Sequence, residues 1–229
     1  MKNTHRRSAS LGLATCLITL ISLVSCAQKK IDEKIKTPVA GVTQATPVNN
    51  PGTETATFAN GCFWCTEAIF EQLDGVISAT AGYTDGHVAN PTYKEVCTGN
   101  TGHAEALQIV YDPSKISFDE LLEVFWETHD PTTLNRQGAD VGTQYRSGIY
   151  YHDAAQKAEA EKYKAELDKS GAFNNPIVTE IKPYTNFYPA EDYHQDYFAN
   201  NENGNPYCKI VIRPKLDKFR EVFKDKLKH

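Results

Sequence analysis

The order in which strand-like and helix-like segments follow one another restricts the fold of this chain more than any other feature. Between residues 55 and 151, short runs suited to strands alternate with segments whose apolar residues recur at helical spacing. Ser117 and Glu120 form a capping box, which places the start of one of these helices. In chain order we expect a strand at 55–59, a helix at 63–73, strands at 76–83 and 105–111, a helix from 117, and a strand at 145–151.

This order, β-α-β-β-α-β, is the split βαβ pattern. The sequence therefore predicts an α+β fold, with a two-layer ferredoxin-like (split βαβ) core and an elaborated, loop-rich C-terminus. The C-terminal part comprises a charged helix from Asp153 to Ser170-Gly171, a strand at 177–181, a loop-rich stretch that reaches Cys208, and an amphipathic helix at 214–228.

The first 25 residues have the pattern of a secretory signal peptide. A basic start precedes an uncharged, mostly apolar run from Leu11 to Val24, which is too short to span a bilayer as a mature helix. The segment ends in Leu23-Val24-Ser25-Cys26, which resembles a bacterial lipobox. The resemblance implies cleavage before Cys26, acylation of Cys26 and attachment to a membrane through that lipid. The alternative is a plain signal peptide cut near Ala27.

Residues 26–53 are expected to be the lipidated cysteine and a flexible tether, because they lack the apolar periodicity that would let them bury surface. Residues 54–229 should form one domain. The net charge of −5 leaves no basic surplus, which argues against nucleic acid as a partner. Since Ala rather than Asp stands at position 27, analogy favours the outer membrane, and we expect a monomer on its periplasmic face.

The segment Gly61-Cys62-Phe63-Trp64-Cys65 is the densest chemical feature. A thiol at the start of a helix faces unpaired backbone N–H groups and the positive end of the helix dipole, so we expect a reactive thiolate at Cys62. Two alternatives stay open, a small buried cysteine and a thioredoxin-type pair of Cys62 with Cys65. No second pair lies at zinc-finger spacing, so we expect no metal.

Strand parity singles out Glu105. Glu105, Leu107, Ile109 and Tyr111 share one face of a predicted strand, which places a carboxyl group in line with apolar side chains. Desolvation there would raise its pKa and make it a candidate acid near neutral pH. The alternative is an exposed position at the end of the strand. Three polar segments are further candidates, namely Asp140–Ser147, Ala190–Tyr197 and Pro206-Tyr207-Cys208.

Short motifs follow one another in order between residues 55 and 227. They are Gly61-Cys62-Phe63-Trp64, Tyr93-Lys94-Glu95-Val96-Cys97-Thr98-Gly99, Thr101-Gly102-His103-Ala104-Glu105, Tyr111-Asp112-Pro113, Gly142-Thr143-Gln144-Tyr145-Arg146-Ser147 and Glu191-Asp192-Tyr193-His194-Gln195. Together they resemble the motifs of peptide methionine sulfoxide reductase of class A, which reduces the S epimer of methionine sulfoxide. Residues 1–53 lie outside this resemblance.

The resemblance implies a role for each matched residue. Cys62 matches the nucleophile that attacks the sulfoxide sulfur, and Glu105 matches the acid that protonates the sulfoxide oxygen. The sulfenic acid left on Cys62 would condense with a second thiol, and an external thioredoxin-like dithiol would reduce the disulfide. The other matches are Tyr93 and Tyr145 as phenols that hold the oxygen, Phe63 and Trp64 as the wall around the methyl group, Asp140, His194 and Tyr197 as surrounding groups, and Cys208 as the recycling cysteine.

Two departures from the family pattern matter. Many members have Gly where Cys65 stands, so either Cys65 or Cys208 could resolve the sulfenic acid, and Cys208 is the one we favour. The lipobox places the chain outside the cytoplasm, which implies a thioredoxin-like donor there. The expected substrate is methionine sulfoxide in peptides or proteins, and no bound cofactor is required. The rival hypotheses are a general dithiol–disulfide oxidoreductase and a lipid-anchored binding module.

Overall fold

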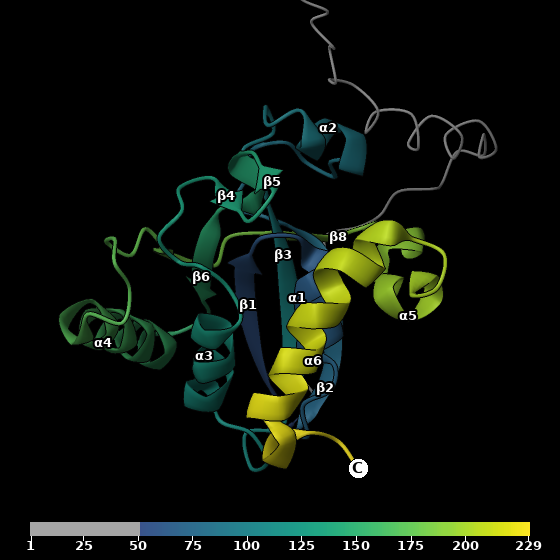
Figure 1. Cartoon of the computed structure of the whole chain (residues 1–229). Helices are drawn as coiled ribbons and strands as arrows, with labels where there is room; N and C mark the ends of the chain where they lie inside the picture. Colours follow the sequence, from purple (N-terminus) through teal and green to yellow (C-terminus); the bar gives the residue numbers. More distant parts are fainter. Residues whose placement is uncertain (1–50) are drawn as a thin grey trace, which may run out of the picture. The chain divides into compact units, whose positions relative to one another are not determined.

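The structure is a computed structural model that describes residues 51–229 (Figure 1). The predicted signal peptide, Cys26 and the tether up to residue 50 lie outside the described residues. Within the described part, no helix has both the length and the apolar character needed to cross a membrane.

A six-stranded sheet forms the centre of the described domain, in the order β7-β6-β1-β3-β2-β8. Its strands are β1 (Glu54–Asn60), β2 (Val76–Thr84), β3 (Ala104–Tyr111), β6 (Ser147–Tyr151), β7 (Glu180–Pro183) and β8 (Phe187–Pro189). Neighbouring strands are antiparallel except for β6 and β7, which are parallel. The α+β class is confirmed, and the ferredoxin-like description of the core stays a prediction.

The helices are α1 (Phe63–Phe70), α2 (Tyr93–Cys97), α3 (Phe118–Glu127), α4 (Ala154–Ser170), α5 (Tyr197–Asn201) and α6 (Arg213–Val222). The predicted capping box of Ser117 and Glu120 opens α3, and Asp153 caps α4 as expected. Thr92 and Glu95 form a second capping box, which starts α2. The short elements are β4 (Arg136–Gln137), β5 (Asp140–Val141), η2 (Thr143–Tyr145), η3 (Asp192–His194), η4 (Cys208–Ile212) and η5 (Lys224–Lys226).

Helix α1 is the central helix of the apolar core. Seven of its eight residues are buried, so it is enclosed nearly all round rather than exposed on one face. Its Ile69 and Phe70 join Phe58 of β1, Leu107 of β3 and Leu216 of α6 in one buried cluster. Figure 1 shows α6 running beside α1, with α3 next to it. Because α1 is held on all sides, the residues at its first turn are fixed in place.

The C-terminal half differs from the prediction in three places. Residues 177–179 are not a strand of the sheet, since Val178 donates its N–H to the carbonyl of Pro131 at 2.9 Å, and the strand begins only at Glu180. Tyr145 lies in the helical turn η2 before β6. Cys208 opens the π-helical segment η4 and is fully buried, so the predicted loop at this residue is wrong.

Candidate active site

A tight turn between β1 and α1 places the first cysteine. Gly61 adopts a φ of +99°, and a Cβ at this position would lie 2.6 Å from the Cβ of Gln137, so a side chain would be both strained and obstructed. Cys62 follows as the N-cap of α1. The N–H of Phe63, one of the unpaired donors at the helix start, donates to Oε2 of Glu105 at 3.1 Å. The turn therefore joins the thiol to the carboxyl group on β3.

Glu105 is only 1% exposed, and burial raises the pKa of its carboxyl group to about 8. The hydrogen bond from Phe63 opposes this shift without overcoming it. Among the described residues, Oε1 has no hydrogen-bond partner. Glu105 is thus a buried acid, protonated at neutral pH, with one oxygen free to act on a bound molecule. The strand-parity argument is confirmed, and the exposed alternative is wrong.

Cys62, the N-cap of α1, and Cys65 in its first turn form a hydrogen-bonded pair with unequal acidity. Burial raises the pKa of Cys62 well above its ordinary value, and the hydrogen bond and the charge of Cys65 raise it further. The expectation of a resting thiolate at Cys62 is therefore wrong, because desolvation outweighs the helix start. The hydrogen bond from Cys62 lowers the pKa of Cys65, with help from the charge of Lys215.

Aromatic rings form a wall beside this pair. The rings of Phe63 and Tyr93 are nearly parallel with centroids 6.3 Å apart, and Trp64 stacks on Tyr197 at 3.7 Å and 7°. The indole N–H of Trp64 donates to Nδ1 of His194 at 3.0 Å. Burial lowers the pKa of His194 to about 4, so the imidazole is neutral and accepts this bond. These contacts fix the orientation of the Trp64 indole.

The two predicted phenols, Tyr93 and Tyr145, are half-buried near Glu105. Burial raises the pKa of both, and the charge of Glu105 raises it further, so both stay protonated and can donate hydrogen bonds. Glu191 holds one of them in place, because the backbone N–H of Tyr93 donates to Oε1 of Glu191 at 2.9 Å. Cys97 is exposed and hydrogen-bonded to Tyr93.

The hydroxyl of Tyr207 enters the site, and sequence reasoning missed it. It donates to Oδ2 of Asp140 at 2.7 Å and lies 3.9 Å from Sγ of Cys65. Its neighbour Cys208 is fully buried, and its pKa is raised by burial and by the charge of Cys65. The one signal for it in the sequence is its place beside Cys208 in Pro206-Tyr207-Cys208, which by itself indicates no role. Glu191 likewise stands out in the sequence only as part of the polar segment Ala190–Tyr197.

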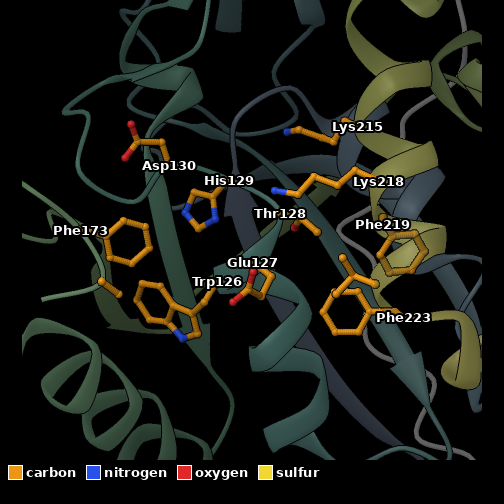
Figure 2. A pocket seen from close by; sticks show the side chains of 12 residues that line it. Trp126, Glu127, Thr128, His129, Asp130, Phe173, Lys215, Lys218, Phe219 and Phe223 are labelled. Carbon is orange, nitrogen blue, oxygen red and sulfur yellow. The ribbon is translucent and has the colours of Figure 1, made fainter. Parts of the chain in front are cut away.

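A separate cavity of ≈ 580 Å³ opens between α3 and α6 (Figure 2). None of the predicted site residues lines it. Its His129 is engaged on both ring nitrogens, with the carbonyl of Phe125 and with Oγ of Ser147, at 2.7 Å each. Burial lowers the pKa of His129 to about 3, so it is a neutral structural histidine. Within residues 51–229 there is also no cluster of three or more potential metal ligands.

The chain is similar to known proteins over the whole described domain. The family model for peptide methionine sulfoxide reductase matches residues 54–227. A relative from Saccharolobus solfataricus, peptide methionine sulfoxide reductase MsrA, is 55% identical over 76% of this chain and 97% of its own length. A relative from Rhodopirellula baltica, MsrA 1, is 55% identical over 78% of this chain and 91% of its own length.

Two solved structures have the same architecture. The reduced form of Mxr1 from Saccharomyces cerevisiae has a TM-score of 0.66 and 40% identity, and the similarity covers 72% of this chain and 95% of that one. Methionine sulfoxide reductase A of Corynebacterium diphtheriae has a TM-score of 0.61 and 40% identity, over 69% of this chain and 79% of that one.

Proposed function

The chain belongs to the peptide methionine sulfoxide reductase family and is a peptide-methionine (S)-S-oxide reductase, and we propose that its reaction passes through a sulfenic acid on Cys62. The observation that carries this proposal is Glu105, a carboxyl group with a pKa of about 8 whose Oε1 has no partner among the described residues. A protonated acid of this kind, beside a thiol and two phenols, suits the polarised S–O bond of a sulfoxide.

The first step transfers the oxygen. Tyr93 and Tyr145 donate hydrogen bonds to the sulfoxide oxygen, and Glu105 gives it a proton as the sulfur of Cys62 attacks the substrate sulfur. The S–O bond of the substrate breaks as an S–O bond to the sulfur of Cys62 forms, so methionine leaves and Cys62 becomes a sulfenic acid, and the thiol proton of Cys62 replaces the one that Glu105 gave. Phe63 and Trp64 enclose the methyl group of the substrate. The substrate sulfur is reduced and Cys62 is oxidised by the same two electrons.

The second step forms a disulfide. A thiol attacks the sulfur of the sulfenic acid, the S–O bond breaks, and the oxygen leaves as water. Cys65 is hydrogen-bonded to Cys62 and has a lowered pKa, while Cys208 is fully buried with a raised pKa. These contacts favour Cys65 as the first resolving thiol, in contrast to our preference from the sequence. Cys208 then takes part in transfer to an external thioredoxin-like dithiol, which is oxidised as the enzyme is reduced.

The cellular setting is part of the proposal. The basic start, the apolar run at 11–24 and the lipobox ending in Cys26 support a lipoprotein, held on the periplasmic face of the outer membrane by a tether at 26–53. Its substrates would be oxidised methionines of envelope proteins, and the enzyme would repair them. A thioredoxin-like donor outside the cytoplasm would supply the electrons.

Single-turnover chemistry tests the roles of the three cysteines. Cys62→Ser should make no methionine, because an alcohol at its ordinary pKa does not attack sulfur. One equivalent of the S-epimer sulfoxide, followed by mass mapping, should reveal a Cys62–Cys65 disulfide in the wild type. Cys65→Ser should still release one methionine but lose turnover with a thioredoxin-like dithiol. Methionine from Cys62→Ser would remove Cys62 from its role, and a Cys62–Cys208 bridge as the first product would reject Cys65.

A further inference from the structure

Glu67 is a buried carboxyl group on α1, three residues after Trp64. Residues at this spacing are neighbours on a helix, so the two side chains leave α1 on the same side. Glu67 is only 2% exposed, and a carboxyl group in such a place is costly unless its oxygens are hydrogen-bonded. Its hydrogen-bond partners therefore indicate what the side chain does.

These partners are backbone groups at the start of α5. Oε2 of Glu67 accepts the N–H of Tyr197 at 3.3 Å, and the backbone of Asp196 also forms a hydrogen bond with the same carboxyl group. Asp196 is the N-cap residue of α5, but its own side chain makes no capping hydrogen bond. The start of α5 is thus capped from the neighbouring helix α1 instead of from within its own segment.

Tyr197 connects this cap to the active site. Its ring stacks on the indole of Trp64, with centroids 3.7 Å apart and an angle of 7° between the planes. The indole N–H of Trp64 donates to His194, which holds the edge of the ring, while Tyr197 covers its face. A close parallel stack requires that the backbone of Tyr197 stay in register with α1, and the hydrogen bond to Glu67 supplies that connection.

We propose that Glu67 is a positioning residue, which caps α5 from α1 and thereby holds Tyr197 against Trp64. The inference rests on the proposed function of Trp64 as part of the wall around the methyl group of the sulfoxide. Glu67 itself touches neither the substrate nor the reacting atoms in this account. Its effect on the reaction passes through the first residue of α5 to the indole.

Glu67→Met tests the role by turnover, because methionine is unbranched and of similar length but offers no oxygen acceptor. KM for the S epimer of methionine sulfoxide should rise by about 5- to 10-fold, the factor that corresponds to one hydrogen bond. With dithiothreitol as reductant, kcat should stay close to that of the wild type, because Glu67 has no hydrogen bond to Cys62 or Glu105 within residues 51–229. Glu67→Gln keeps an oxygen acceptor and should restore most of the wild-type KM.

Glu71→Met is the matched control, since it removes another partly buried carboxyl group, one turn further along the chain. No hydrogen bond from this carboxyl group to α5 is present in the part of the chain that the structure describes, so KM should not change. A double-mutant cycle tests the route through Tyr197. Once Tyr197→Leu has removed the stacked ring, adding Glu67→Met should raise KM no further.

Fluorine NMR of protein labelled with 5-fluorotryptophan tests the positioning without any turnover. The chain has two tryptophans, and the resonance that Trp64→Phe removes belongs to Trp64. Glu67→Met should shift this resonance, because the Tyr197 ring above the indole moves, while Glu67→Gln and Glu71→Met should leave it in place. The resonance of Trp126, which lies in the core on α3, is the internal reference.

Two results would overturn the proposal. One is a Trp64 resonance at its wild-type position in Glu67→Met, and the other is a double variant whose KM is the product of the two single effects. A shifted resonance with an unchanged KM would support the positioning role and would instead reject Trp64 as a wall of the substrate site. The proposed function and the present inference therefore fail in different ways.

Discussion

At the scale of single residues, the site depends on groups whose burial changes their acidity. Cys62 and Glu105 both have raised pKa values, which means that the resting site holds a thiol and a carboxylic acid rather than a thiolate and a carboxylate. The enzyme can therefore deliver a proton and a sulfur nucleophile to the same bound molecule. Cys65, whose pKa is lowered, accepts the hydrogen bond of the Cys62 thiol.

The protonation of Glu105 predicts how the first step depends on pH. Because only the protonated carboxyl group can donate, the rate of methionine formation in a single turnover should fall as pH rises through about 8. Glu105→Gln should slow this step by about 10²–10⁴-fold and abolish that fall, since an amide has no proton to transfer. Rapid-quench kinetics between pH 6 and 10 measure both the loss of rate in the variant and the pH dependence of each enzyme. An unchanged rate constant in the variant would exclude Glu105 as the acid.

At the scale of elements, the turn before α1 should be intolerant of a side chain. Gly61→Ala places a Cβ at a φ of +99° and against Gln137, so it should cost about 1–3 kcal/mol of stability and lower activity by shifting Cys62. Gly171→Ala is the matched control. It also sits at a positive φ, but nothing lies within 4 Å of its Cβ, so it should lose stability alone. Urea titrations and turnover assays would show whether the two effects separate.

Glu67 on α1 links that helix to α5. It is buried, its Oε2 accepts the N–H of Tyr197 at 3.3 Å, and burial raises its pKa to about 7. Between its unfolded pKa near 4.5 and about 7, the folded state holds a proton that the unfolded state has lost, so this group makes stability fall as pH rises.

Glu67→Gln removes the buried charge and keeps an oxygen acceptor. We expect the variant to match the wild type in stability at pH 4 and to exceed it at pH 8. Glu166→Gln, at an exposed position of α4, is the control and should leave the pH dependence unchanged. A melting temperature of Glu67→Gln at or below the wild type at pH 8 would contradict this account.

The sequence predicts local secondary structure well, but it predicts poorly which side chains from distant segments are in contact. The capping box of Ser117 and Glu120 and the periodicity of β3 depend on residues a few positions apart, so Ser117 and Glu105 could be placed in advance. The contact of Tyr207 with Asp140 joins residues 67 positions apart, and no local pattern encodes it. The prediction of a thiolate at Cys62 was wrong for a related reason. The helix start can be recognised in the sequence, but the depth at which Cys62 is buried cannot.

At the scale of the whole molecule, the proposed lipid anchor should be separable from catalysis. Cys26→Ser should move the protein from the membrane fraction to the soluble fraction, while turnover of free methionine sulfoxide with a small dithiol stays the same. Cell fractionation with mass analysis of the N-terminus measures the first effect. Retention of Cys26→Ser in the membrane would show that the protein is held there by something other than the lipid.

The C-terminal residues of the described domain lie against the segment that follows α1. Leu227 pairs with Leu73, Lys228 donates its N–H to the carbonyl of Gln72, and Asp74 donates its N–H to the carbonyl of Lys226. Residues 226–228 thus cover the end of α1, an early helix of the domain, although they follow it by most of the domain's length. The chain must therefore be made as far as residue 228 before these contacts can form, so the core around α1 closes only after nearly all of the domain has been synthesised.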